Sequence, residues 1–267
     1  RPERRRQVFD VNVLGTQNVL RACRAKGVAR LVYTSTINVA MRTPVREGDE
    51  TLPTFGEGEG DLYGESKSAA EREVLAEDGD GLRTAALRLG GLWGAGDGAI
   101  MITEFIEQLA AGRFVMLVGD GSAVLDNTHV VNAIDAHLLA AAALAETPDR
   151  VGGEAFFITD GEPMNGLEWF RPLVEGLGAP WPSRRVPAGV MLVLGRLLEW
   201  IHHFGGPEPA LAYRGMLNIT RDASFCIDKA REELGYHPTI QSGDGLPAML
   251  PDAKRLYDLA LRGDRTQ

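Results

Sequence analysis

The chain has few cysteines and an excess of acidic over basic residues, and both features limit the classes of function that it can have. Its 267 residues contain two cysteines, Cys23 and Cys226, which are too few for a disulfide framework and share no metal-ligand spacing. We therefore expect two buried thiols, no metal site and a reducing, cytoplasmic compartment. Acidic residues outnumber basic ones by 37 to 28, for a net charge of −9. This balance argues against a nucleic-acid partner, because phosphate binding needs a concentrated positive field.

A leader peptide and a membrane-spanning run are also missing. The chain opens with RPERRRQVFD, which has neither an initiator methionine nor an apolar segment, so we expect a piece of a longer protein. The most apolar stretch, residues 186–204, is interrupted by Arg196 and Glu199, well short of the ~18 to 20 apolar residues of a span. We expect a buried or interfacial helix there, which is compatible with peripheral membrane contact.

Helical and strand patterns alternate through the first 160 residues. The predicted helices cover residues 7–27, 61–77, 100–112 and 130–146, and the predicted strands cover 30–36, 82–90 and 154–160. Such alternation predicts an α/β fold with a doubly wound parallel sheet and right-handed crossovers. Beyond Gly161 helices dominate, so we predict a sheet domain over 1–160, a smaller, mostly helical substrate-binding cap over 161–242 and a C-terminal helix over 243–267.

Lysine is scarce, and one of the few lysines, Lys67, lies four residues after a tyrosine. Only four of the 28 basic residues are lysine, and Lys67 follows Tyr63 by four residues in DLYGESKSAAEREVL. On a helix this spacing places both side chains on one face. An ammonium near a phenol stabilises the phenolate and lowers its pKa, which makes tyrosine a usable acid or base. A Tyr-x-x-x-Lys pair also occurs by chance, so the neighbouring residues must show whether this pair is functional.

Those surroundings include Thr36, the last residue of the strand pattern RLVYTST. The carboxyl ends of parallel strands are where open α/β sheets bind ligands. A hydroxyl there can hold a substrate oxygen while Tyr63 moves its proton. Taken by itself, Thr36 is equally well explained as a threonine that caps a loop.

Four ordered motifs, VNVLGTQNVLRACRAKGVARLVYTST, YGESK, LRLGGLWGAGD and THVVNAIDAHLLAA, together resemble the extended short-chain dehydrogenase/reductases. Within them the chain is most similar to the 3β-hydroxysteroid dehydrogenase and sterol-4-carboxylate 3-dehydrogenase branch. The resemblance implies a Rossmann-type fold that lacks its first βαβ portion. It also implies an oxidoreductase acting on a secondary alcohol or ketone of a bulky apolar substrate, with NAD or NADP as cofactor and NAD favoured; a homodimer is compatible with it.

The resemblance also implies roles for particular residues. Thr36, Tyr63 and Lys67 take the catalytic positions, and Asn12 matches an asparagine on the helix beneath the site, although an ordinary surface amide remains an alternative. The implied cofactor-binding residues are Tyr33, Ser35, Tyr63, Lys67, Leu89 and Gly90. For the substrate, we expect Leu194 and Leu198 of the apolar stretch to contribute, although core packing explains that stretch equally well.

Two departures from the family pattern stand out. Leu89 follows Arg88 where the family usually has proline. No G-x-x-G-x-x-G follows a strand anywhere in the sequence, although the family binds the cofactor pyrophosphate with this loop. The isolated chain is therefore a candidate for an inactive fragment.

Two other functions remain open at this point. A sugar-nucleotide epimerase or dehydratase would share the Thr, Tyr and Lys, and Arg184 and Arg185 could bind its diphosphate. A non-catalytic dinucleotide-sensing protein could have the same fold, because a fold does not fix function. Such a protein usually lacks the Tyr or the Lys, and both are present here.

Overall fold

The structure is a computed structural model that describes residues 2–42, 44–79, 81–96, 100–203 and 220–263. Its contacts divide the chain into two compact units that interleave along the sequence. Unit 1 comprises Arg1–Gly90, Val130–Gly161 and Phe225–Thr239, and unit 2 comprises Gly91–His129, Glu162–Ser224 and Ile240–Gln267. The functional boundaries at residues 160 and 242 stay a prediction.

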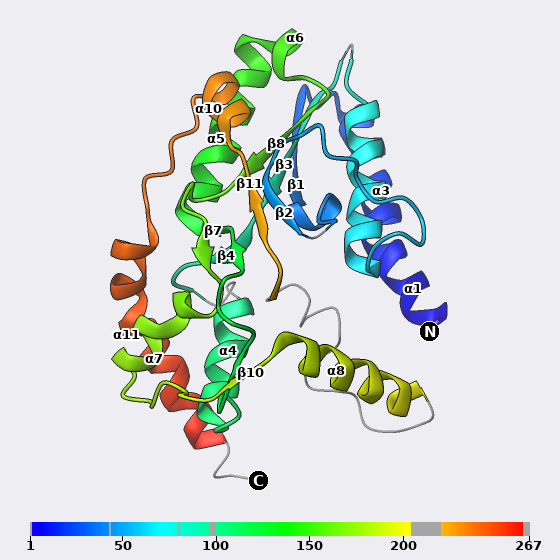
Figure 1. Cartoon of the computed structure of the whole chain (residues 1–267). Coiled ribbons are helices and arrows are strands. Elements are labelled where there is room, and N and C mark those ends of the chain that lie inside the picture. The colour runs from blue at the N-terminus through cyan, green and yellow to red at the C-terminus, as the bar shows by residue number, and fades with distance from the viewer. Residues whose placement is uncertain (1, 43, 80, 97–99, 204–219, 264–267) are drawn as a thin grey trace. The chain divides into compact units, whose positions relative to one another are not determined.

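Unit 1 contains a parallel sheet with helices on both faces. Its helices are α1 (Pro2–Phe9), α2 (Gly15–Lys26), α3 (Leu62–Ala76), α5 (Val130–Glu146), α6 (Pro148–Val151) and α10 (Asp228–Leu234), and its strands are β1 (Arg30–Thr36), β2 (Val45–Gly48), β3 (Arg83–Leu89) and β8 (Glu154–Ile158). The sheet has the order β1-β3-β8, and all neighbours are parallel. Figure 1 shows α3 on one side of this sheet and α5 on the other.

The central strand β3 explains why helices cover both faces. Residues 84–89 of this strand are all buried, as expected for a parallel strand that contacts helices on each side. The predicted α/β class and parallel sheet are therefore confirmed. The predicted strand over 30–36 coincides with β1, and Gly27 ends the preceding helix in the left-handed conformation, with φ of 65°, as glycine does at helix ends.

The N-terminal helix departs from the prediction of one regular helix. A π-helical segment, Asp10–Leu14, joins α1 to α2. Between β1 and α3, the chain contains a 3₁₀ turn, Ile37–Val39, and the short strand β2. Cys23 is buried as predicted, but Cys226 is only half-buried, because it lies in the connection between the last strand and α10.

Unit 2 is built from short strands and longer helices. Its helices are α4 (Ile100–Ala110), the 3₁₀ turn Glu168–Phe170, α7 (Arg171–Gly176), α8 (Ala188–His203) and α11 (Ser242–Gly263), and its strands are β4 (Gly91–Trp93), β5 (Leu117–Val118), β6 (Val124–Leu125), β7 (Asn127–His129), β9 (Met164–Asn165), β10 (Arg185–Val186) and β11 (Ala223–Phe225), the last reaching unit 1 with Phe225. Its core contains Trp93 and Trp169, whose rings meet edge to face with centroids 5.2 Å apart. The Trp169 indole N–H donates to Ser242 Oγ at 2.9 Å, so the core contains a satisfied polar bond.

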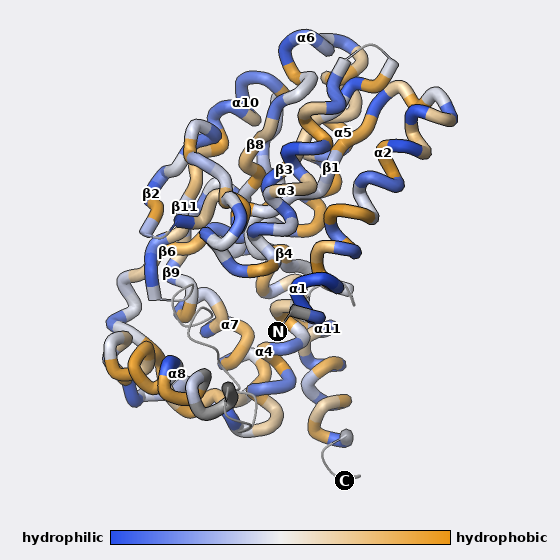
Figure 2. Tube along the Cα trace, turned by 90° about the vertical axis from the view of Figure 1, so that its right-hand side faces the viewer, coloured by the Kyte–Doolittle hydropathy of each residue, from blue (hydrophilic) through white to orange (hydrophobic). Residues whose placement is uncertain are grey.

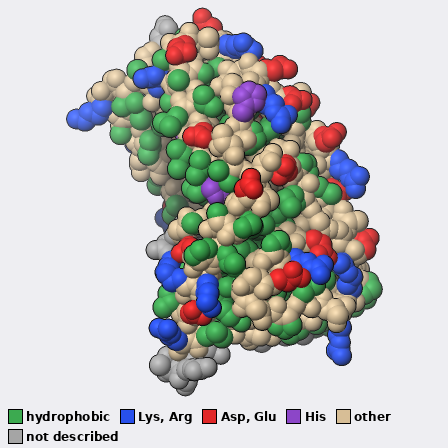
Figure 3. Space-filling model, turned by 90° about the vertical axis from the view of Figure 1, so that its left-hand side faces the viewer, with side chains coloured by type: hydrophobic (Ala, Val, Ile, Leu, Met, Phe, Trp, Pro, Cys, Tyr) green, Lys and Arg blue, Asp and Glu red, His purple; other side chains and the backbone are tan. Residues whose placement is uncertain are grey.

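Charge on one face and the length of the helices bear on nucleic-acid and membrane contact. On the face in Figure 3, basic and acidic side chains are interspersed over the part that the structure describes, which does not form the positive field that nucleic acids need. Within the described residues, no helix is long and apolar enough to cross a membrane.

Candidate active site

The parallel register of unit 1 brings the ends of three strands to one edge of the sheet. Thr36 at the end of β1 is paired with Leu89 at the end of β3, and Leu89 is paired with Ile158 at the end of β8. Leu89 lies inside the ladder, and the Gly90 N–H donates to the Ile158 carbonyl at 3.2 Å. Leucine in place of proline therefore lets β3 continue as a regular strand up to this edge.

Tyr63 and Thr36 meet at this edge. Helix α3 begins at the cap residue Asp61, whose carboxylate accepts from the Gly64 N–H at 2.7 Å, so Tyr63 lies in the first turn. Tyr63 is 48% exposed, and the Thr36 side chain is near enough to affect the pKa of its phenol. Burial raises the pKa of Tyr63, and the neighbouring Thr36 side chain opposes that rise. The phenol is thus protonated at neutral pH and lies next to a hydroxyl.

Lys67 lies one helical turn after Tyr63 and reaches the end of β1. Its ammonium donates to the Thr34 carbonyl at 2.6 Å and lies 4.2 Å from the centroid of the Tyr33 ring. Burial lowers the pKa of Lys67, and the negative charge of Glu71 opposes that effect. The spacing predicted that Lys67 lowers the pKa of Tyr63, but in this structure burial raises that pKa and the expected lowering is not seen.

Asn12 connects the N-terminal helix to the first turn of α3. It lies in the π-helical segment, and its side-chain amide donates to Ser66 Oγ at 2.8 Å. Ser66 Oγ in turn donates to the Tyr63 carbonyl at 2.9 Å. Asn12 therefore reaches Tyr63 through Ser66, and π-helical turns often occur at functional sites.

A buried ion pair lies behind these groups. The Glu71 carboxylate accepts from Ser35 Oγ at 2.5 Å and from Arg88 Nη2 at 2.7 Å, while Arg88 Nε lies 3.1 and 3.2 Å from the two carboxylate oxygens. The Glu71 and Arg88 side chains are 1% and 6% exposed. Ser35 therefore points into the interior of unit 1, where it binds a charged pair.

Sequence analysis did not single out Ser66, Glu71 or Arg88 as parts of this network. Glu71 follows Lys67 by four residues, so the helical spacing that joined Tyr63 to Lys67 could have identified it. No local signal joins Glu71 to Arg88, because they lie on a helix and a strand with a turn between them.

The edge of the sheet suits the ribose of a dinucleotide. In the described part of the chain, the Lys67 ammonium uses one of its three N–H groups, for the Thr34 carbonyl, which leaves two donors for a pair of vicinal hydroxyls. The glycine-rich loop that would bind a pyrophosphate does not occur in the sequence. The donors of Lys67 therefore fit a ribose, and no described residue is assigned to the pyrophosphate.

Leu194 and Leu198 belong to unit 2, on α8. They are 42% and 36% exposed and are part of an apolar stripe on that helix. Figure 2 shows α8 as a mostly hydrophobic helix. The exposed members of this stripe are Val190, Val193, Leu194, Leu197, Leu198 and Trp200.

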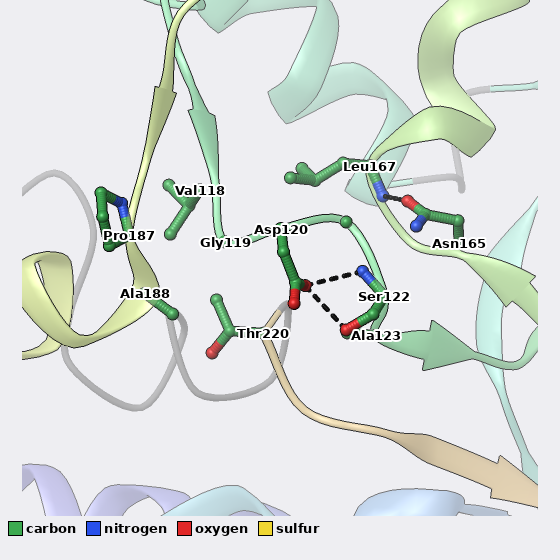
Figure 4. Close-up of a pocket in the computed structure, with 11 residues that line it drawn as sticks. Val118, Gly119, Asp120, Ser122, Ala123, Asn165, Leu167, Pro187, Ala188 and Thr220 are labelled. Atoms are coloured by element: carbon green, nitrogen blue, oxygen red, sulfur yellow. Dashed lines mark hydrogen bonds between the residues drawn. The ribbon is translucent and has the colours of Figure 1, made fainter.

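A cavity of about 310 Å³ also lies in unit 2 (Figure 4). It is lined by Val118, Gly119, Asp120, Gly121, Ser122, Ala123, Asn165, Leu167, Pro187, Ala188 and Thr220. The Asp120 carboxylate accepts from the backbone and hydroxyl of Ser122, which lowers the pKa of Asp120. None of the described lining residues is Lys or Arg; the neighbouring Arg185 pairs with Glu168 at 2.8 Å.

The parallel sheet and the Thr, Tyr and Lys at its carboxyl edge define a Rossmann-type protein of the extended short-chain dehydrogenase/reductase class. The sequence model of the 3-beta hydroxysteroid dehydrogenase/isomerase family matches residues 2–188. The chain belongs to this family. The predicted branch is thereby confirmed.

Curated relatives agree with this assignment. The chain is 40% identical over 260 residues to 3 beta-hydroxysteroid dehydrogenase/Delta 5-->4-isomerase of Mycobacterium tuberculosis, which covers 96% of the chain and 69% of that protein. It is 41% identical over 248 residues to short-chain dehydrogenase/reductase family 42E member 1 of Mus musculus, covering 87% of the chain and 62% of that protein.

A solved structure supports the fold. The chain is similar to UDP-glucuronic acid 4-epimerase from Bacillus cereus in complex with NAD, with a TM-score of 0.65 and 20% identity, over 92% of this chain and 68% of that one. At this identity the similarity concerns the fold alone.

Proposed function

We propose that the protein is an NAD(P)-dependent oxidoreductase that interconverts a secondary alcohol and a ketone on a bulky apolar substrate, such as a 3β-hydroxysteroid or a 4-carboxysterol. One observation carries this proposal: Tyr63 and Thr36 lie next to each other at the carboxyl edge of the sheet, with Lys67 one turn away. Family membership and the relatives' names support the same reaction class. They support NAD or NADP as the cofactor.

The chain's own residues account for binding and proton transfer. Thr36 holds the substrate oxygen by a hydrogen bond, and Tyr63 gives a proton to that oxygen in reduction or takes it in oxidation. Lys67 binds ribose hydroxyls, and Asn12 fixes the first turn of α3 through Ser66. The cofactor, when bound, supplies or accepts the two electrons at the carbon.

The raised pKa of Tyr63 predicts how each direction depends on pH. Ketone reduction needs the protonated phenol, which burial preserves to higher pH. Alcohol oxidation needs the phenolate, so its rate should increase as pH rises through the pKa of Tyr63.

Two features of unit 2 support an apolar substrate over a sugar nucleotide. The exposed stripe of α8 provides apolar surface, and each ~100 Å² of such surface buried is worth about 2.5 kcal/mol before binding costs. The described lining of the cavity has no cation to bind a diphosphate, and it contains the Asp120 carboxylate, which would repel one.

The test is a panel of substrates that is offered to the full-length protein encoded by the gene. NAD and NADP are each combined with a 3β-hydroxysteroid, a 4-carboxysterol, a short secondary alcohol and a UDP-sugar, and reduced cofactor is followed by its absorbance. We expect turnover of the hydroxysteroid or the carboxysterol. Turnover of UDP-sugars, detected by product chromatography, without turnover of bulky apolar alcohols would replace this proposal with the epimerase or dehydratase alternative.

A further inference from the structure

Glu71 is the only acidic side chain that the described contacts place in the interior between α3 and the sheet. It leaves α3 one turn after Lys67, and its carboxylate is almost completely buried. It binds Ser35 on β1 and Arg88 on β3. One carboxylate thus connects the helix that holds Tyr63 to two of the three strands.

The third strand also contacts this pair. The Arg88 guanidinium lies over the Phe157 ring of β8 at 5.2 Å. The Phe157 N–H donates to Glu50 at 2.7 Å, and burial raises the pKa of that carboxyl. The ion pair is therefore enclosed by the sheet, where a charge is costly unless it is paired.

The same strand, β1, holds both Lys67 and the Glu71 carboxylate. The Thr34 carbonyl accepts from the Lys67 ammonium, and the next residue, Ser35, donates to Glu71. Thr34 offers its backbone carbonyl to α3 and Ser35 offers its side chain, because alternate residues of a strand point to opposite faces. The end of β1 is therefore bonded to α3 twice. A movement of Glu71 would shift the carbonyl that receives Lys67.

We propose that Glu71 is a positioning residue that acts through Lys67: it fixes the end of β1 against α3 and supplies the negative charge that keeps the half-buried ammonium protonated. This inference rests on the proposed function, in which Lys67 binds the ribose hydroxyls of the cofactor. Its electrostatic part follows from the opposed effects on Lys67, whose pKa is lowered by burial and raised by Glu71.

Other charged or titratable groups face the same region. Arg88 lies on β3, the phenols of Tyr33 and Tyr63 lie on β1 and α3, and His137 on α5 lies 2.8 Å from the Thr34 hydroxyl. Of these, Glu71 is the group that opposes the effect of burial on Lys67. Its removal should therefore make Lys67 lose its proton at lower pH.

Direct titration of Lys67 tests this inference without an activity assay. The chain has four lysines, so lysine labelled with ¹³C at Cε gives few NMR signals, and Lys67→Arg assigns the one of interest. The test variant is Glu71→Gln/Arg88→Met, which removes both charges and leaves neither partner buried and unpaired. The control is Glu73→Gln, which removes the same charge from the same helix where the side chain contacts Gln17.

We expect the Lys67 signal to titrate at lower pH in the double variant and at the wild-type pH in the control. If the double variant does not fold, Glu71→Asp keeps the charge beside Arg88 but withdraws it from Lys67, and a smaller shift in the same direction is expected.

Two outcomes distinguish a failure of this inference from a failure of the proposed function. An unchanged Lys67 titration in a folded Glu71 variant would overturn the inference and show that Glu71 only pairs with Arg88. A shifted titration in a protein that oxidises no alcohol would leave the coupling of Glu71 to Lys67 standing and remove the proposed function.

Discussion

Unit 1 and unit 2 present different kinds of surface to a ligand. In unit 1 a regular sheet places polar groups at one edge and fixes them by hydrogen bonds of 2.5–2.8 Å, from Ser35, Lys67 and Asn12. In unit 2 strands of two or three residues support an apolar helix, α8, and an open cavity. The comparison suggests that reaction chemistry depends on the rigid unit and substrate choice on the irregular one.

The largest effect we expect is on the stability of unit 1. Arg88→Ala leaves Glu71 charged, buried and unpaired, which should cost about 3–5 kcal/mol of unfolding free energy. Arg171→Ala in unit 2 is the matched control, because its pair with Glu175 is exposed on both sides and exposed pairs contribute little to stability. Urea denaturation measures both, and equal losses would contradict the contrast between the units.

The next effect concerns proton transfer. Tyr63→Phe removes the hydroxyl and should lower turnover at least ~100-fold, as expected for the loss of a general acid or base. The half-exposed ring remains, so urea denaturation should show little change in stability. Near-normal steady-state rates in this variant would remove Tyr63 from the mechanism.

A smaller effect is expected from Lys67→Arg. The variant keeps a positive charge, but a planar guanidinium replaces the compact ammonium between the Thr34 carbonyl and the cofactor. We expect kcat/KM to fall about tenfold, since one charge-assisted hydrogen bond is worth roughly 1.5–3 kcal/mol. Full activity would show that only the charge matters at this position.

Substrate choice is tested on α8. Leu194→Asp or Leu198→Asp should raise KM for a steroid by about fivefold to tenfold and leave KM for a short alcohol nearly unchanged, because a charge replaces apolar contact surface. Leu259→Asp on α11 is the matched control, since that leucine is also exposed. Circular dichroism must show each variant folded, and an equal effect on both substrates would exclude α8 from selectivity.

The last expected effect concerns the stability of the core of unit 2. Trp169→Phe keeps an aromatic ring beside Trp93 but removes the N–H that bonds to Ser242. We expect a loss of about 1–3 kcal/mol, because Ser242 is buried and loses its donor. Catalysis of a short alcohol should be unaffected, and a large loss of turnover would show that this core supports the chemistry.

The elements that sequence analysis predicted well have strong local signals. The strand over 30–36 is bounded by Gly27, whose positive φ only glycine adopts easily, and α3 begins at a capping residue, Asp61. The Tyr63 and Lys67 pair was found for the same reason, because both residues lie on one helix.

The parts that were not predicted depend on contacts between distant segments. Glu71 and Arg88 are ordinary residues in sequence, and only the packing of α3 on β3 makes them a buried pair. The π-helical segment has no signature of its own, since the same residues suit an α-helix. Cys226 is half-buried because it lies in a connection, where burial does not follow from residue type.

The π-helical segment also has a consequence for insertions and deletions. It is equivalent to one extra residue in an α-helix, and the two helices that it joins both contact α3, through Arg5 with Glu65 and Gln17 with Glu73. Deleting one residue from this segment would therefore restore a regular α-helix and keep both contacts with α3. Inserting one more residue would turn one helix by about 100° relative to the other unless a second bulge formed, so this segment should tolerate a deletion better than an insertion.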